Sequence, residues 1–155
     1  MGLNFQDFLH QTNFLPLENG DWKLITVDHT NCNTKVVTSQ IREYLKGYTN
    51  GIYVYTNLQN EVYYVGQGKL KGRVIKKYKQ AISESIEIPS PRGLFFRSKK
   101  EVLNVYVRNV ENYMEQIAIE AMLSNVLKPK YLDFLQEFNV YKKAGKLEEL
   151  FNKLK

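Results

Sequence analysis

The middle of the chain alternates between apolar and polar positions in a way that predicts a β-hairpin. Ile52–Thr56 and Glu61–Val65 are two runs rich in β-branched and aromatic residues, and Asn57–Asn60 joins them as a turn. From Leu70 the apolar residues follow the three-and-four-residue spacing of a helix. Val102–Val110 returns to alternation and predicts a further strand. The centre of the chain therefore reads as a strand pair, a helix and a strand.

A second central helix is predicted over Tyr113–Leu127. Asn112 and Glu115 have the spacing of a capping box at its start, and Lys128–Pro129 ends it because the residue before a proline avoids the helical conformation. Its buried stripe is expected to consist of Met114, Ile117, Ala118, Ala121 and Met122.

Weaker patterns at both ends predict helical additions. Asn4–His10 is expected to form a short helix and Trp22–Val27 alternates like a strand. Ser39 is expected to be the N-cap of a helix near Gln40–Lys46. Ser83–Lys100, which contains Pro89 and Pro91, is expected to be a polar loop. The chain ends on apolar residues at helical spacing: Leu147, Leu150, Phe151 and Leu154.

This order of elements predicts an α+β fold, with a small three-stranded antiparallel sheet flanked by helices. A chain of 155 residues is expected to form one compact domain. Within it we distinguish an N-terminal extension over 1–50, a core over 51–131, and a helical tail over 132–155.

Composition excludes several classes of protein. The 43% hydrophobic content, with 13% aromatics, argues against intrinsic disorder. No apolar stretch approaches the ~20 residues that span a bilayer, and the first residues do not resemble a signal peptide. Cys32 is the only cysteine, so the chain has no internal disulfide. We expect a soluble, cytoplasmic protein without a membrane partner.

The positive charge is concentrated in one third of the chain. The formal net charge is +6, but Lys69–Lys100 alone holds ten bases and two acids, and the remainder is net negative. Such a concentration is typical of proteins that contact nucleic-acid phosphates. The alternative is a solvated, lysine-rich helix surface. The residues expected to contact DNA through their charge are Lys69, Lys71, Lys76, Lys79, Arg97, Lys99 and Lys100.

Four short motifs occur in a fixed order around these elements. Gly51-Ile52-Tyr53 opens the first hairpin strand and Tyr64-Val65-Gly66 closes the second; Gly66–Arg73 leads into the helix, and Glu120 precedes Pro129-Lys130-Tyr131 by nine residues. Together they resemble the GIY-YIG nuclease superfamily over about Gly51–Tyr131, with Val65 in place of the usual isoleucine.

The resemblance implies a site for phosphodiester hydrolysis. It implies that Tyr53 is the base, that Tyr64 positions the water or phosphate, and that Arg73 binds a phosphate. It also implies that Glu120 is the carboxylate of a single Mg²⁺ or Mn²⁺ site. A free phenol has a pKa near ~10, so nearby cations would have to lower the pKa of Tyr53. Each of these residues taken singly also has an ordinary structural explanation.

Further positions follow from the same resemblance. Gly66 and Gly68 are expected to let the backbone approach DNA closely. Many members carry a histidine about four residues after the arginine, and here Lys77 and Tyr78 are the two candidates for its place. Leu132 stands where the family usually has an asparagine, which favours a degenerate nuclease.

The sequence therefore predicts a metal-dependent DNA endonuclease of the restriction or phage and mobile-element type. Duplex DNA is the expected substrate, and a homodimer is expected because one site cuts one strand at a time. The N-terminal extension over 1–50 is expected to serve DNA recognition or dimerisation. The alternatives are a catalytically degenerate nucleic-acid-binding module and a protein-interaction domain with a lysine-rich surface.

Overall fold

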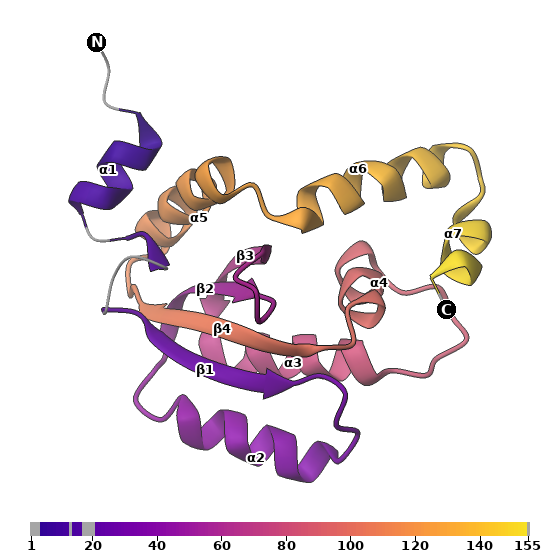
Figure 1. The fold of residues 1–155 in the computed structure, drawn as a ribbon, viewed down its shortest axis with the longest axis horizontal. Helices are drawn as coiled ribbons and strands as arrows, with labels where there is room; N and C mark the ends of the chain where they lie inside the picture. Colours follow the sequence, from indigo (N-terminus) through magenta and orange to yellow (C-terminus); the bar gives the residue numbers. More distant parts are fainter. Residues whose placement is uncertain (1–3, 13, 17–20, 155) are drawn as a thin grey trace.

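The computed structural model describes residues 4–12, 14–16 and 21–154, and these form a mixed α+β structure. The four strands are β1 (Lys23–Asp28), β2 (Asn50–Thr56), β3 (Val62–Lys69) and β4 (Val102–Asn109). They form one antiparallel sheet in the order β1-β4-β2-β3 (Figure 1). The predicted sheet of three strands is wrong, because the N-terminal strand β1 pairs with β4 along its whole length, from Lys23 opposite Val107 to Asp28 opposite Val102.

Seven helices surround the sheet in the described part of the chain. They are α1 (Phe5–Gln11), α2 (Thr34–Tyr44), α3 (Leu70–Ile82), α4 (Pro91–Ser98), α5 (Tyr113–Leu127), α6 (Lys130–Lys143) and α7 (Leu147–Lys153). Figure 1 shows α2 and α3 on one side of the sheet and α1 and α5 on the other, with α6 leading away to α7. None of the described helices is both long and apolar enough to cross a membrane.

Side chains alternate between two cores because successive strand residues point to opposite faces. Tyr53 and Tyr55 of β2 pack with α2 and α3, whereas Ile52 and Val54 pack with α1 and α5. Residues of β1 and α2, such as Val27 and Ile41, belong to the same buried cluster as Tyr53. The first fifty residues thus contribute to the cores on both faces of the sheet, with β1 and α2 on one face and α1 on the other.

Two helices differ from the sequence prediction. Helix α2 begins at Thr34, where the Asn33 side chain accepts a hydrogen bond from the Val36 N–H (3.3 Å), and Ser39 lies inside the helix. Because the helix starts earlier, it includes the buried residue Val37, which would precede a helix that began at Ser39. The expected loop contains α4, whose N-cap Ser90 accepts from the Gly93 N–H (3.2 Å).

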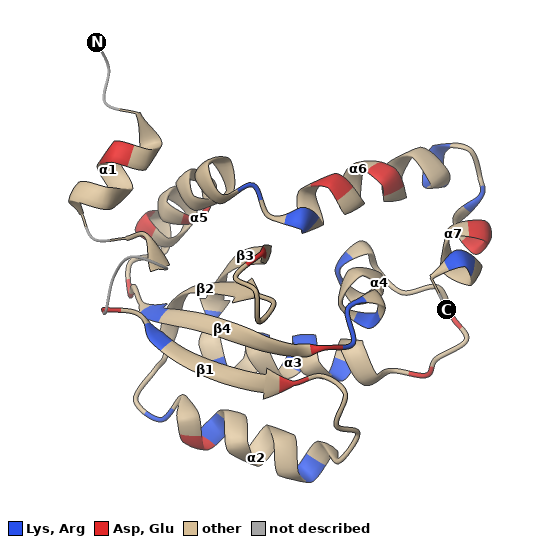
Figure 2. Cartoon of the chain, viewed as in Figure 1, with Lys and Arg blue, Asp and Glu red and all other residues tan. Residues whose placement is uncertain are grey.

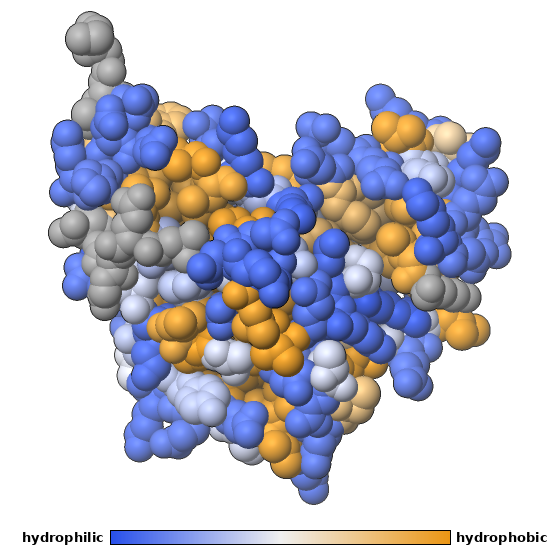
Figure 3. Space-filling model, in the orientation of Figure 1, coloured by the Kyte–Doolittle hydropathy of each residue, from blue (hydrophilic) through white to orange (hydrophobic). Residues whose placement is uncertain are grey.

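Helix α5 has the predicted bounds, but its buried side is not the predicted one. Gln116, Ile119 and Leu123 are buried, while Met114 is 71% and Ile117 39% exposed. Figure 3 shows apolar side chains over α5, next to α1. The helix is apolar on more than one side, so its sequence pattern does not reveal which side the sheet covers.

Candidate active site

Five elements converge at the β3 edge of the sheet around one small cavity. The edge position matters because β3 has a neighbouring strand on one side only, so helices from both faces can reach past it. The cavity has a volume of about 190 Å³. Its lining residues are Tyr53 of β2, Tyr64, Gly66 and Gln67 of β3, Arg73 of α3, Arg92 of α4 and Glu120 of α5.

The two tyrosines of the motifs lie on the same face of the hairpin. Their rings are stacked, with centroids 6.0 Å apart and an interplanar angle of 17°. Tyr53 lies opposite Gly66 in the strand register, and a Cβ atom on Gly66 would be 2.4 Å from the Tyr53 hydroxyl oxygen. The absence of a side chain at Gly66 therefore makes room for the Tyr53 phenol of the protein itself. The sequence predicts that this space is needed for the approach of DNA.

Two arginines place positive charge at the cavity. The Arg92 Nε donates a hydrogen bond to the Tyr64 hydroxyl (2.8 Å). Arg73 lies against Gly68, where a Cβ would come within 2.9 Å of the guanidinium Nε and where φ is +131°. A residue other than glycine at position 68 would be strained and would displace Arg73.

Burial sets the pKa values of the acidic groups in the cavity. It raises the pKa of Tyr53 well above its ordinary value, and the neighbouring Tyr64 adds to the rise, against the lowering effect of Arg73. The nearby cations Arg73 and Arg92 do lower the pKa of Tyr53, as the role of a base requires, but in the substrate-free protein the effect of burial outweighs them. Burial also raises the pKa of Glu120, and Arg92 and Arg73 oppose that rise.

Lys77 and Tyr78, the two candidates for the histidine position, face different surroundings. Lys77 is only 2% exposed, and its Nζ lies 5.2 Å from the centre of the Tyr64 ring. Burial, together with Arg92, Lys76 and Arg73, lowers the pKa of Lys77 to about 8. Tyr78 donates a hydrogen bond to the Asn31 carbonyl (2.6 Å) and packs in the core with α2. The structure thus brings Lys77 beside the cavity and does not bring Tyr78 there.

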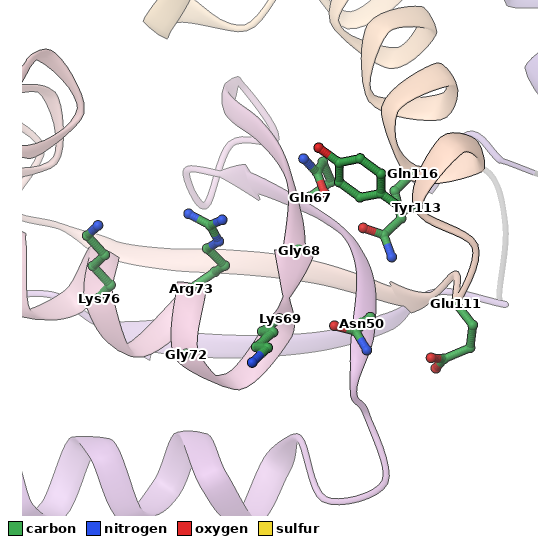
Figure 4. Close-up of a pocket in the computed structure, with 10 residues that line it drawn as sticks. All are labelled: Asn50, Gln67, Gly68, Lys69, Gly72, Arg73, Lys76, Glu111, Tyr113 and Gln116. Atoms are coloured by element: carbon green, nitrogen blue, oxygen red, sulfur yellow. The ribbon is translucent and has the colours of Figure 1, made fainter.

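A larger groove adjoins the cavity and shares Gln67 and Arg73 with it. Its volume is about 640 Å³, and Figure 4 shows the ten residues that line it. Three of the predicted basic residues are among them: Lys69, Arg73 and Lys76. Lys79 lines a shallower hollow with Lys76 further along α3, and Lys71 is half-buried on the same helix.

The remaining predicted DNA contacts lie elsewhere, near α4 and α7. The Arg97 Nη1 donates to the Ser85 carbonyl (2.7 Å), and the guanidinium lies over the Phe151 ring. The Lys99 Nζ lies 5.3 Å from the centre of the Tyr63 ring. Lys100 shares a separate hollow with Arg97. Figure 2 shows this division of Lys and Arg between α3 and the end of α4.

Arg92 and Gln67 were missed as site residues. A local signal for helix α4 was present, because a serine N-cap followed by proline, here Ser90-Pro91, is a common helix start. This signal places Arg92 in the first turn of a helix and not in a loop. Gln67 carried no local signal. Leu132, in place of the family's asparagine, is 40% exposed at the start of α6, whereas its neighbour Tyr131 packs against the Tyr64 ring with centroids 5.0 Å apart.

A metal at this site would depend on one protein carboxylate. Within the described residues, no group of three or more His, Cys, Asp or Glu side chains is arranged to hold a metal ion. Glu120 is half-buried in the cavity, and burial disfavours its charged form. One carboxylate completed by waters and substrate oxygens suits Mg²⁺, so the donor set fits a hard divalent ion that arrives with its substrate.

The candidate active site therefore combines two stacked tyrosines, two arginines and one carboxylate, beside a buried lysine and a basic groove. No family model, curated protein or solved structure matches the chain.

Proposed function

We propose that this protein is a divalent-metal-dependent DNA endonuclease of the GIY-YIG type, which hydrolyses phosphodiester bonds. The convergence of Tyr53, Tyr64, Arg73, Arg92 and Glu120 on one cavity carries the proposal. These side chains come from five different elements, and their chemistry matches what a phosphodiester needs: donors for the phosphate, a proton acceptor and a metal ligand. The adjoining groove, with its basic residues, supports a polyanionic substrate.

In this proposal the two arginines bind the scissile phosphate. The Arg73 and Arg92 guanidinium groups each present several donors, and they stabilise the negative charge that increases on the phosphoryl oxygens in the transition state. Glu120 would hold a single Mg²⁺ or Mn²⁺ ion, which supplies positive charge for the leaving oxygen. Both arginines already oppose the effect of burial on the pKa of Glu120.

Tyr53 is the proposed proton acceptor for the attacking water. In the free protein burial keeps its proton on the phenol oxygen, and the positive charge of Arg73 favours the tyrosinate more than that of Arg92 does. Tyr64 is held by Arg92 and orients the phosphate or water beside Tyr53. Cleavage of both strands of a duplex would need two protomers, because one cavity accepts one scissile phosphate. A cytoplasmic location would fit such an enzyme.

The raised pKa of Tyr53 favours a second candidate function, a nucleic-acid-binding module that has lost catalysis. A module of this kind would keep the basic groove and bind DNA without cutting it. Leu132, in the place of the family's asparagine, points in the same direction.

Cleavage of plasmid DNA with Mg²⁺ or with Mn²⁺, and with a chelator as the blank, separates the two candidates. Glu120→Gln keeps the size of the side chain but removes the charge, so we expect DNA binding to persist and cleavage to fall by several orders of magnitude. Glu115→Gln is the matched control, since Glu115 is exposed on the same helix and lines neither the cavity nor the groove. Wild-type protein that binds DNA and never cuts it would establish the module instead.

A further inference from the structure

The groove beside the cavity has two chemically different walls. One wall is basic and comes from Lys69 at the end of β3 and from Arg73 and Lys76 of α3. The opposite wall comes from α5, where Tyr113 and Gln116 lie one turn apart. Figure 4 shows the two sets of side chains on either side of the strand at Gly68. A nucleotide has the same division, with an anionic phosphate at one end and a flat base at the other.

Tyr113 offers a free aromatic surface to the groove. It is the first residue of α5 and is 63% exposed. Among the described residues its ring stacks on no other aromatic ring, whereas the rings of Tyr53 and Tyr131 both contact the Tyr64 ring beside the cavity. A large, exposed ring at the edge of a basic groove is the arrangement that proteins use to stack nucleobases.

Gln116 adds a fixed hydrogen-bond acceptor beneath that ring. The residue is only 4% exposed, and its Nε2 donates to the Val110 carbonyl (2.7 Å). This bond fixes the orientation of the amide, so Oε1 is the atom that remains to accept a hydrogen bond from a ligand. Gln67 lines both the groove, where the base would lie, and the cavity, where the phosphate would lie.

The acidic residue at the groove does not oppose an anion. Glu111 lines its outer end and accepts a hydrogen bond from the Thr49 hydroxyl. In Figure 4 its carboxylate points away from Arg73, Lys76 and Tyr113. The charge facing the ligand is therefore positive.

We propose that this groove binds the nucleotide next to the scissile phosphate, with its base unstacked from the DNA and placed against Tyr113. The proposal rests on the proposed function and deepens it by naming the substrate class. Both faces of a base inside a duplex are covered by its neighbours, so Tyr113 can stack only on a base that is unpaired or displaced. DNA with an unpaired nucleotide beside the cut, as in an overhang or a flap, is accordingly the preferred substrate.

Equilibrium binding in the presence of a chelator tests the groove without cleavage. Fluorescence anisotropy would compare a labelled blunt duplex with the same duplex carrying a short single-stranded overhang. Wild-type protein is expected to prefer the overhang. Tyr113→Ala should weaken overhang binding by about 5- to 100-fold and remove the preference, because stacking on an aromatic ring contributes that much per base. Tyr113→Phe keeps the ring and should bind within about twofold of wild type.

Two further variants separate this proposal from general DNA binding. Met114→Ala removes a neighbouring exposed apolar side chain that lies outside the groove. This variant should bind the blunt duplex and the overhang duplex with wild-type affinity. Lys76→Gln should weaken binding of both DNAs alike. If Tyr113→Ala binds the overhang like wild type while Lys76→Gln is weakened, the groove does not hold a base and the proposed function survives. If wild-type protein neither binds nor cuts any DNA, the proposed function fails and this inference fails with it.

Discussion

Gly66 and Tyr53 illustrate how one residue determines the position of another at this site. The Tyr53 phenol occupies the space that a side chain at position 66 would need. The hydroxyl is thereby directed into a cavity with Tyr64, Arg73 and Glu120, while the ring remains buried in the core. A buried phenol holds its proton strongly. The Tyr53 hydroxyl is therefore well positioned in the cavity, but it is protonated in the free protein, which is unfavourable for a group that must accept a proton.

We therefore expect Tyr53→Phe to abolish cleavage without unfolding the protein. The substitution removes only the hydroxyl, and the ring keeps its contacts with Tyr55 and Tyr64. Loss of a general base typically costs a factor of about 10² to 10⁴ in rate. A plasmid-cleavage time course measures the rate, and gel-shift affinity with thermal unfolding provides the controls. A variant that cuts at the wild-type rate would mean that another group accepts the proton.

Lys77 is a second residue whose burial has a measurable consequence. Its folded-state pKa of about 8 lies below the ordinary value of 10.5. Below pH 8 the folded protein carries a buried ammonium group, and this cost decreases as the pH rises from 8 towards 10.5, because the folded state loses the proton first.

Lys77→Met should therefore stabilise the protein at about pH 7, by up to about 3 kcal/mol, and the gain should shrink by about pH 10. Urea unfolding of wild type and variant at each pH measures the free energies of unfolding. It can be followed by the fluorescence of Trp22, which is buried and is the only tryptophan of the chain. An equal difference between variant and wild type at the two pH values would show that Lys77 does not titrate in this window. We also expect the variant to lose cleavage activity, because Lys77 contributes charge beside Tyr64.

At the scale of elements, β2 occupies a central position between β3 and β4. Its one glycine, Gly51, faces Gly68 of β3 and Asn109 of β4. A Cβ at position 51 would lie 1.8 Å from the Arg108 carbonyl oxygen, a backbone atom that cannot move without breaking the ladder. The first glycine of the motif is thus explained by strand packing alone.

Gly51→Ala should destabilise the protein by more than about 3 kcal/mol or prevent folding. Gly72→Ala is the matched control, because nothing lies within 4 Å of a Cβ at that position inside α3. Alanine is the better helix former, so this variant should gain about 1 kcal/mol of stability. Thermal unfolding of the two variants checks the contrast, and a Gly51→Ala protein as stable as wild type would contradict it.

At the scale of the whole molecule, the basic segment of the sequence divides into two groups. Lys69, Arg73, Lys76 and Lys79 follow α3 past the groove, whereas Arg97 and Lys99 interact with Phe151 and Tyr63. Of these two groups only the first lies beside the candidate active site, where Arg92 of the same segment joins Arg73 in the cavity. Charge that is contiguous in the sequence is therefore not one surface in the folded protein.

Duplex binding should weaken steeply with salt, with a log–log slope between about −3.5 and −4.5 for four or five phosphate contacts. Lys76→Gln should reduce the magnitude of this slope by about 1, because it removes one phosphate contact. Lys99→Gln should leave the slope unchanged, since its ammonium group lies over a ring. Affinity that does not depend on salt, or an equal effect of the two variants, would contradict the division.

The sequence by itself determined the elements whose signals are local. The hairpin, the start of α5 at Asn112 and the α+β class follow from alternation, turn residues and capping, all of which act between near neighbours. The motif residues Tyr53, Tyr64, Arg73 and Glu120 were also identifiable, and the structure brings all four to one cavity.

Only the tertiary structure decided what depends on remote contacts. The pairing of β1 with β4, the buried side of α5 and the place of Arg92 are determined by segments far apart in the chain. The direction of the Tyr53 pKa shift belongs to the same group, because desolvation depends on everything that surrounds the phenol. Local patterns report hydrogen bonding and periodicity between neighbours, whereas burial is a property of the assembled fold.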